Sequence, residues 1–506
     1  MPAETPLAPR FRWRFAPPPP PELVAEVRHP VLAGALAGRG VDGVEGARAF
    51  LARAGRDDNP FRLAGMNRAV ERLRGAIRAG ERVAVYGDFD ADGVTATALL
   101  LTTLRALGAD ALAHLPHRTR DGYGVHAHAL EELVRRGVRV VVTVDCGVRA
   151  VEEVARASAL GLDVIVTDHH LPGPVLPAAV AVVDPKRPGD PYGDTSLAGV
   201  GVAYKLAQAL LRVAARADRR PPPLREEELL DLVALGTVAD VAPLLGENRV
   251  LVHRGLAELR AARRPGIQAL CEVAGVAPGA LTSRDLGFSL GPRLNAAGRM
   301  DDARLALELL VANDAARARQ LAERLDEHNR ARRAATDVAA ADARAALDGG
   351  LDAPLLVWGS PTVAPGVVGL VAGELARAHY RPAMVLRIDG DLARASLRSI
   401  PELDVVAALD ELGELLERWG GHAAAAGLTV RTERIPELER RLTGIVADRL
   451  AGQDLRPSLA IDAVLPPSEI DRTLHEALER LAPFGEGNPE PQLCAAGAEV
   501  RATRSV

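Results

Sequence analysis

The segment "YGDFDADG" places three carboxylates, Asp88, Asp90 and Asp92, at alternate positions ahead of Gly93. Alternating acidic residues are typical of sites for divalent cations. They also match the start of an EF-hand calcium loop, but the twelfth position of that loop requires a glutamate and is Leu99 here. The run "RVAVYG" before the segment predicts a buried strand, where an EF-hand has a helix. The pattern therefore favours a metal site that does chemistry, with a structural Asp-rich turn as the alternative.

Further acidic and imidazole side chains follow other predicted strands. The run "VRVVVTV" is followed by Asp145, and "LDVIVT" is followed by Asp168, His169 and His170. Asp240 follows a predicted helix. In a parallel α/β sheet, ligands bind outside the carboxyl ends of the strands, so we expect these residues to meet the Asp-rich segment at one rim. Taken singly, Asp145 could be a helix N-cap and one histidine is usually structural, but the repetition favours a joint site.

The types of these side chains indicate which metal they would bind. Carboxylates with one or two imidazoles and no thiolate favour Mn²⁺ or Mg²⁺. A structural zinc site would want paired cysteines, and Cys146 stands alone. Two such ions about 4 Å apart suit the attack of water on phosphorus. The chain has no G-x-x-x-x-G-K-[ST] motif, so nucleotide-driven motor chemistry has no support.

The composition is that of a large globular protein in a reducing compartment. With 506 residues, 48% of them hydrophobic, the chain has material for roughly three or four domains of about 150 residues. Its three cysteines exclude a disulfide framework, and we expect a cytoplasmic protein. The N-terminus has no apolar signal-peptide core, and no stretch approaches 18 uninterrupted apolar residues. We therefore expect neither a signal peptide nor a membrane span.

The formal net charge of −5 does not by itself indicate a nucleic-acid ligand. Carboxylates reserved for metals contribute to that charge without repelling a phosphate once the ions are bound. The basic residues are nearly all arginine, and the only lysines are Lys186 and Lys205. Arginine suits bidentate phosphate contacts, although genome composition explains this bias more simply.

Strand and helix patterns alternate in the first half of the chain, which predicts a parallel sheet covered by helices. The expected strands are 82–86, 138–147, 162–170 and 179–185, and the expected helices include 93–107, 126–136 and 226–236, with a loop at 216–228. Residues 1–28 are expected to form an irregular arm, ahead of a helical region at 29–80.

The second half of the chain predicts a helical linker and a smaller α/β lobe. The stretch 301–347 has few breakers and mixed charge, so we expect one or two long helices there. Strand and helix patterns resume at 353–360, and a helix is expected at 469–481. The predicted fold class is α/β, with these domains: an N-terminal arm and helical region (1–80), a parallel-sheet domain (81–300), a connecting helix (301–350), a smaller α/β domain (351–452) and a partial β module (453–506).

Several motifs, taken in their order, resemble a known family. "GDFDADG", "TVDCG", "TDHH" and "GTVADVAPLLGENR" look like the four acidic motifs of the DHH phosphoesterases. "GPRLNAAGRMDDA", "RASLRSI" and "GGHAAAAG" resemble the remaining motifs of the RecJ subfamily with its DHHA1 domain, and "LAPFGEGNPEP" is similar to the lead-in to its OB-fold. The resemblance covers roughly residues 25–500.

The resemblance implies a 5′→3′ exonuclease specific for single-stranded DNA, acting in recombination and repair beside a helicase and a single-strand-binding protein. Two ions, Mn²⁺ or Mg²⁺, would be its cofactors. The implied metal ligands are Asp88, Asp90, Asp92, Asp145, His169 and Asp240, without a decision on which two of the first three bind directly. His170 would lie at the scissile phosphate, and Asp168 would orient an imidazole. The implied substrate contacts are Arg118, Arg293, Arg299, Ser396, Arg398, Gly420, Gly421 and His422.

Three features depart from the family pattern. Val363 and Ala364 replace a Trp-His pair, which affects one substrate or packing contact. Leu397 replaces a glycine, and its bulk is expected to change the approach to the nucleotide. Val506 falls at about the first strand of the expected OB-fold, a module that supplies stacking platforms for single strands, so we expect weaker and less processive DNA binding.

Other functions remain open beside the exonuclease. Small DHH proteins cleave oligoribonucleotides or cyclic dinucleotides, and a related soluble pyrophosphatase has a different C-terminal lobe. A non-catalytic DNA-binding scaffold is a further alternative, but the acidic motifs that such relatives lose are intact here. Without the family, "GGHAAAAG" could be only a tight turn and a helix of small residues.

Overall fold

The structure, a computed structural model, describes residues 11–53, 59–218, 221–495 and 502. The chain divides into a large unit, residues 15–328 and 461–506, and a small unit, residues 1–14 and 329–460. Parts of the predicted N-terminal arm, of the 216–228 loop and of the C-terminal β module lie outside the described residues. No helix in the described part of the chain is long and apolar enough to cross a membrane.

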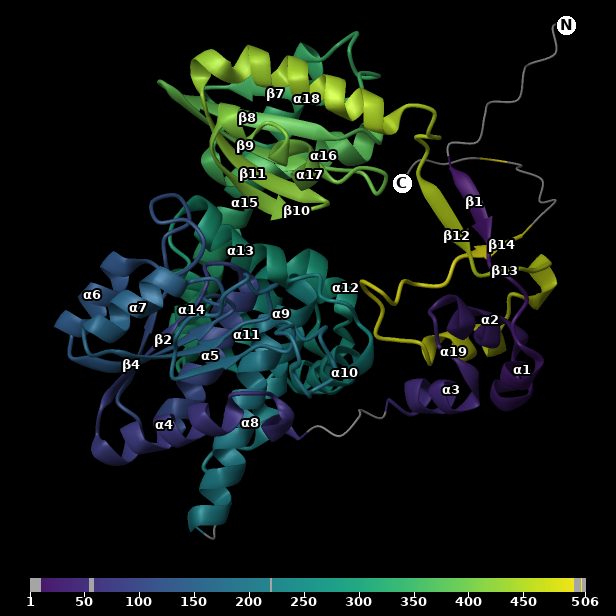
Figure 1. The fold of residues 1–506 in the computed structure, drawn as a ribbon. Helices are drawn as coiled ribbons and strands as arrows, with labels where there is room; N and C mark the ends of the chain where they lie inside the picture. Colours follow the sequence, from purple (N-terminus) through teal and green to yellow (C-terminus); the bar gives the residue numbers. More distant parts are fainter. Residues whose placement is uncertain (1–10, 54–58, 219–220, 496–501, 503–506) are drawn as a thin grey trace, which may run out of the picture. The chain divides into compact units, whose positions relative to one another are not determined.

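A five-stranded parallel sheet forms the centre of the large unit, as the alternating pattern predicts (Figure 1). Its strands, in the order β3-β2-β4-β5-β6, are β2 (Arg82–Tyr86), β3 (Ala111–His114), β4 (Val138–Val144), β5 (Asp163–Thr167) and β6 (Ala181–Val183). Four of these strands were expected from the sequence. The edge strand β3 was not, because its four residues "ALAH" are too short for a periodic signal.

Both faces of this sheet are buried, because side chains along a strand alternate between its two sides. The covering helices are α4 (Met66–Ala79), α5 (Ala91–Ala106), α6 (Ala127–Arg135), α7 (Val151–Ala159) and α8 (Gly199–Asp218). Val83 and Val85 pack into one core with α5 and α8, while Ala84 and Tyr86 pack into another with α6 and α7. The sheet is thereby held rigidly between two helical layers, with its carboxyl edge left for side chains from the loops.

A second group of helices completes the large unit beside α5 and α8. These are α9 (Leu230–Ala239), α10 (Gly246–Ala261), α11 (Pro265–Ala274), α12 (Ser283–Asp285), α13 (Gly291–Met300) and α14 (Arg304–Leu310). The stretch 301–347, for which one or two long helices were expected, contains two helices, α14 and then α15 (Ala315–Ala346). The division between the two units falls within α15.

The N-terminal segment is more ordered than the predicted irregular arm. Residues 12–27 contain β1 (Arg12–Phe15) and α1 (Pro21–Val27), and the prediction is wrong for this described part. Helices α1, α2 (Pro30–Gly38) and α3 (Gly43–Ala52) bury their apolar side chains against Leu481, next to α19 (Arg472–Glu479). Segments from the two ends of the sequence therefore share one small core.

Arg249, on α10, ties this small core to the rest of the large unit. Its guanidinium stacks 3.7 Å above the Phe50 ring and donates to the carbonyl oxygens of Phe50, Arg480, Leu481 and Ala482. Burial lowers the pKa of Arg249 to about 10. The last residue of the motif "GTVADVAPLLGENR" is thus a structural clamp rather than a site residue.

Replacing Arg249 by methionine should lower the free energy of unfolding by about 2–3 kcal/mol, because buried carbonyl groups lose their donor. The measurement is the thermal unfolding midpoint of the full chain. Arg254→Met, on the same helix with 44% of its side chain exposed, is the control and should leave the midpoint unchanged. Equal unfolding midpoints for the two variants would contradict the structural role of Arg249.

The small unit contains a mixed sheet in the order β10-β11-β9-β8-β7, in which only β7 and β8 are parallel. Its elements are β7 (Leu356–Ser360), α16 (Val368–His379), β8 (Ala383–Asp389), β9 (Leu392–Arg398), α17 (Val405–Asp410), β10 (Leu416–His422), β11 (Ala425–Arg431) and α18 (Ile435–Leu450). The motif "GGHAAAAG" lies in the β10–β11 hairpin, so the alternative of a small-residue helix is wrong. Three short strands follow in the sequence: β12 (Ser458–Ile461), β13 (Ala463–Val464) and β14 (Leu493–Cys494). Strand β12 pairs with β1, and β13 pairs with β14.

Candidate metal centre

The carboxyl edge of the parallel sheet gathers the acidic and imidazole residues. Asp88 follows β2, Asp145 follows β4, Asp168 follows β5, and Asp240 caps the end of α9. Three groups have potential ligand atoms within 4.8 Å of one another: Asp88, Asp90 and Asp145; Asp92, His169 and Asp240; and Asp145, His169 and His170. The structure therefore brings together all six residues expected as metal ligands, and His170 with them.

Local hydrogen bonds hold the Asp-rich segment in shape. Asp90 is the N-cap of α5, and its carboxylate accepts from the backbone N–H groups of Asp92 and Gly93. The Asp92 carboxylate accepts from the N–H groups of Gly199 and Val200 at the start of α8, at 2.7 and 2.8 Å. A Cβ on Gly93 would lie 2.6 Å from the backbone of Asp88, so only glycine fits there.

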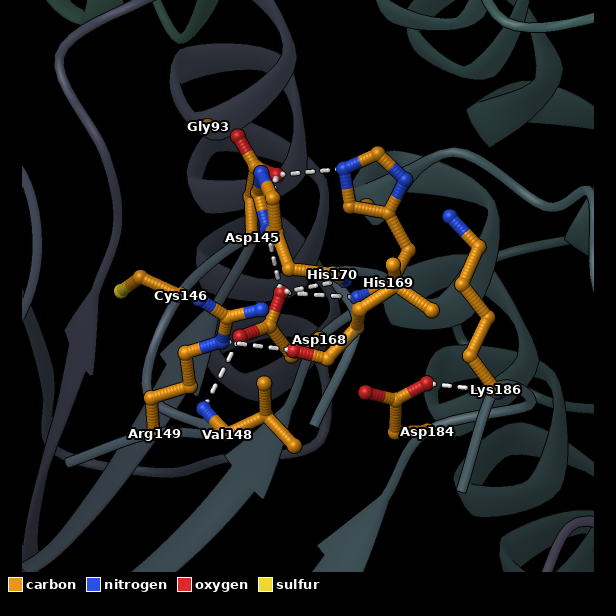
Figure 2. Close-up of polar contacts among 12 residues, drawn as sticks. Gly93, Asp145, Cys146, Val148, Arg149, Asp168, His169, His170, Asp184 and Lys186 are labelled. Atoms are coloured by element: carbon orange, nitrogen blue, oxygen red, sulfur yellow. Dashed lines mark hydrogen bonds and ion pairs between the residues drawn. The ribbon is translucent and has the colours of Figure 1, made fainter. Parts of the chain in front are cut away.

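Asp145 adopts an unusual backbone conformation, with φ at 61°. Asparagine and aspartate tolerate this left-handed region better than most residues. The next helix, α7, begins at Val151 and has Ala150 at its N-cap position, so the N-cap alternative for Asp145 is wrong. The turn instead directs the Asp145 carboxylate toward His169, as Figure 2 shows.

Several carboxylates of like charge lie close together in the site. Burial, with neighbouring carboxylates, raises the pKa of Asp88 and Asp145 well above the usual range. The same causes raise the pKa of Asp92 to about 7 and that of Asp240 to about 9. Burial also lowers the pKa of His169 to about 3, so its imidazole is neutral and can act as a ligand. Such a cluster requires cations to become stable in its ionised form.

Among the buried atoms without a hydrogen-bond partner in the described residues, three belong to the proposed ligands: Asp88 Oδ1, Asp145 Oδ1 and His169 Nε2. His169 Nε2 lies 3.1 Å from Asp145 Oδ1, which is a close approach without hydrogen-bond geometry. Buried polar atoms are normally hydrogen-bonded, so unpaired acceptors in one cluster indicate that the cluster binds a cation. Carboxylate oxygens with an imidazole nitrogen fit Mn²⁺ or Mg²⁺.

His170 has two polar partners at one ring nitrogen. Its Nδ1 lies 2.8 Å from Asp168 Oδ1 and 3.0 Å from the hydroxyl of Tyr123. The other oxygen of Asp168 accepts from the N–H of Val148 at 2.9 Å, which fixes the carboxylate. Although burial opposes it, the hydrogen bond with Asp168 raises the pKa of His170. The Asp168 carboxylate thus contacts an imidazole, and its role in orienting that ring stays a prediction from the family resemblance.

The contribution of Tyr123 was not identified from the sequence. It lies between Gly122 and Gly124, both with positive φ, in the loop after β3. A tyrosine between two turn glycines, close to other motif residues, was the available signal, but only the fold shows that the hydroxyl reaches His170.

The expected arginine contacts of the large unit have different surroundings. The Arg118 guanidinium stacks 4.0 Å above the Phe89 ring, beside the acidic cluster, and burial lowers its pKa. Arg293 is buried and donates to Asp326, to the Ser289 carbonyl and to the Val273 carbonyl. These bonds point to a structural role for Arg293, and its contact with substrate stays a prediction, as does that of Arg299.

The remaining predicted contacts lie in the small unit. Arg398, on β9, donates to the Ser396 hydroxyl at 2.9 Å, and a Cβ on Gly369 would lie 2.8 Å from the Arg398 guanidinium. Gly421 has φ at 152°, and a Cβ there would overlap the Ala425 carbonyl oxygen. Its neighbours Gly420 and His422 are in the same strand, β10.

A cavity of about 290 Å³ lies next to Arg398 within the small unit. Four arginines line it, namely Arg332, Arg333, Arg377 and Arg398, together with the acidic residues Asp337 and Glu374. The excess of positive charge and the bidentate geometry of arginine suit a phosphate group. Arg332, Arg333 and Arg377 were not identified from the sequence, because their helical positions look like ordinary solvated faces.

Comparison with known proteins decides the family. Three family models match: the DHH family, N-terminal domain (82–237), the DHHA1 domain (352–448) and the RecJ OB domain (461–506). The single-stranded-DNA-specific exonuclease RecJ of Salmonella typhimurium is 40% identical over 85% of this chain and 77% of its own length. The chain belongs to the RecJ family. The resemblance stated from the motifs is thereby confirmed, and so is the α/β fold class.

Other RecJ proteins extend this comparison. The RecJ of Bacillus subtilis is 39% identical over 99% of this chain, which spans 63% of that protein's length. The crystal structure of RecJ in complex with Mn²⁺ from Thermus thermophilus has a TM-score of 0.82 and 33% identity, covering 95% of this chain and 69% of that one. The Mg²⁺ complex from the same organism has a TM-score of 0.74 and 32% identity, covering 95% and 67%.

Two departures from the RecJ pattern have a structural explanation. Leu397 is buried and packs into the core of the small unit, while its neighbours Ser396 and Arg398 project from the other side of β9. Its bulk therefore points away from the Arg398 side. Val363 is also buried in a core, and its carbonyl accepts from Arg387 at 2.6 Å.

Proposed function

We propose that this chain is a metal-dependent exonuclease that hydrolyses the phosphodiester bonds of single-stranded DNA from the 5′ end and releases 5′-mononucleotides. The orphaned, buried ligand atoms of Asp88, Asp145 and His169 carry the proposal, because a purely structural cluster would pair them. Membership of the RecJ family supports the substrate and the reaction. We place its activity in recombination and repair in the cytoplasm, beside a helicase and a single-strand-binding protein.

The proposed metal ligands are those that the structure gathers, namely Asp88, Asp90, Asp92, Asp145, His169 and Asp240. Two divalent ions bound there would supply an activated water and would compensate the charge that develops on the phosphate. Asp90 and Asp92 would also keep the start of α5 and α8 in place, because each carboxylate accepts two backbone N–H groups.

His170 would donate a hydrogen bond or a proton to the phosphate. Its raised pKa favours the protonated imidazole, and Asp168 with Tyr123 fixes the orientation of the ring. The arginine cavity of the small unit supports a second contact with the DNA backbone, through Arg377 and Arg398. Recognition of a 5′-phosphate by Ser396 and Arg398 of the small unit would give the polarity. Arg118 of the large unit is proposed as a further contact with the substrate.

A test of this function uses two single-stranded oligonucleotides, one labelled at the 5′ end and one at the 3′ end. With Mn²⁺ or Mg²⁺ we expect immediate release of a labelled mononucleotide from the first and progressive shortening of the second. A chelator should stop both reactions. Cleavage of cyclic dinucleotides or short oligoribonucleotides, with long DNA left intact, would instead favour the small-substrate phosphodiesterases of the superfamily. Metal-independent DNA binding without any cleavage would favour a scaffold.

A further inference from the structure

Lys186 is one of two lysines in the chain, and the two have different surroundings. Lys205 is fully buried and forms an ion pair with Glu247. Lys186 lies in the turn after β6, where the Asp184 carboxylate accepts from its backbone N–H at 2.7 Å. This bond and the preceding Pro185 fix the backbone from which the Lys186 side chain starts.

The Lys186 side chain extends alongside His169 at the candidate metal centre (Figure 2). Within the part of the chain that the structure describes, its ammonium group has neither a hydrogen bond nor an ion pair. Its charge lies close enough to act on both His169 and Asp240, two of the potential metal ligands.

An ammonium group at this position cannot coordinate the metal ions. It carries three donors and no acceptor, so it is not a ligand, and its charge repels a divalent cation. Ions bound at the centre would compensate the charges of the carboxylates, which would leave the Lys186 charge available to an anion. Lysine is an effective point-charge partner for phosphate.

We propose that Lys186 binds a phosphate oxygen of the DNA strand at the Asp240 side of the metal centre. This inference rests on the proposed function, because it needs a phosphodiester substrate beside the ions. Lys186 would have two opposite effects: it would strengthen binding of DNA and weaken binding of the metal. A lysine that only stabilises the turn would not strengthen DNA binding, because its backbone N–H makes the turn contact.

The test compares Lys186→Met, Lys186→Arg and Arg187→Met in the full chain. Arg187→Met is the matched control, because it removes the same charge from the neighbouring residue, whose guanidinium donates to the Val182 carbonyl at 2.9 Å. Binding of a fluorescent single-stranded oligonucleotide is measured by anisotropy against salt, with Ca²⁺ in place of Mn²⁺ to slow cleavage. Binding of Mn²⁺ alone is measured by calorimetry.

We expect Lys186→Met to raise the Kd for the oligonucleotide about fivefold and to reduce the slope of log K against log salt by about 0.7, the value for one phosphate contact on a single strand. The Kd for Mn²⁺ should fall about threefold, since a repulsive charge is lost. Lys186→Arg should retain DNA binding. Arg187→Met should change the Kd for the oligonucleotide and the Kd for Mn²⁺ less than Lys186→Met does.

Unchanged DNA affinity in Lys186→Met, or equal losses in Lys186→Met and Arg187→Met, would overturn the assignment. A failure of the proposed function would look different. The unaltered chain would then bind the oligonucleotide, with the same dependence on Lys186, but would not cleave it with Mn²⁺ or Mg²⁺.

Discussion

Asp145→Asn should reduce metal-dependent hydrolysis by about 10³-fold or more, equivalent to about 4 kcal/mol of transition-state stabilisation. Asp145 belongs to two of the three groups of potential ligands, so its loss would weaken the binding of both ions. Its carboxylate is buried, and Oδ1 has no hydrogen-bond partner among the described residues. Asparagine keeps the size of the side chain and tolerates the φ of 61°, which alanine would not.

The same variant should fold, and without metal it should be more stable than the unaltered chain. Burial and the neighbouring carboxylates disfavour the charged form of Asp145, so a neutral amide relieves that repulsion. The measurements are the rate of mononucleotide release with Mn²⁺ and the thermal unfolding midpoint in a chelator. Asp110→Asn, at a residue whose side chain is 56% exposed, is the control for both. A variant that kept its hydrolytic rate would exclude Asp145 as an essential ligand.

Binding of Mn²⁺ should strengthen steeply as the pH rises from 6 to 9. Metal ligands must be deprotonated, and the pKa is raised to about 7 at Asp92 and to about 9 at Asp240. Release of one proton per bound ion gives about a tenfold decrease in Kd per pH unit, and hence about 10²–10³ over this range. Calorimetry in buffers of different ionisation enthalpy would count the protons released. A Kd independent of pH would contradict the raised pKa values.

The stability of the metal-free protein should change in the opposite direction. A carboxyl whose pKa is raised on folding binds more protons in the folded than in the unfolded state, between its ordinary pKa near 3.8 and its raised value. The free energy of unfolding therefore falls as the pH rises through this window, up to about pH 9. Saturating Mn²⁺ should remove most of this fall, because the ions compensate the carboxylates. Unfolding by denaturant at pH 6, 7.5 and 9, with metal and with chelator, would measure the difference.

Elements with strong periodicity, and the chemistry at their ends, were predictable from the residues alone. Strands β2, β4, β5 and β6 were predictable, because four short, β-branched runs alternate with helical patterns. Side chains that follow such strands meet at one edge of a parallel sheet, so the gathering of Asp88, Asp145 and His169 could be expected before any coordinates. The ligand types likewise indicated Mn²⁺ or Mg²⁺, and the order of the motifs gave the family.

The hydrogen-bond partners of these side chains, and the cores into which their neighbours pack, could be read only from the folded chain. Tyr123 reaches His170, and the donors of Arg293 are taken by Asp326 and two carbonyls. Arg249, within a motif that looked functional, instead holds carbonyl groups from both ends of the chain. Leu397 points into a core. Local periodicity encodes the direction of a side chain within its own element, but hydrogen-bond partners and packing depend on segments far apart in the sequence, which meet only when the chain folds.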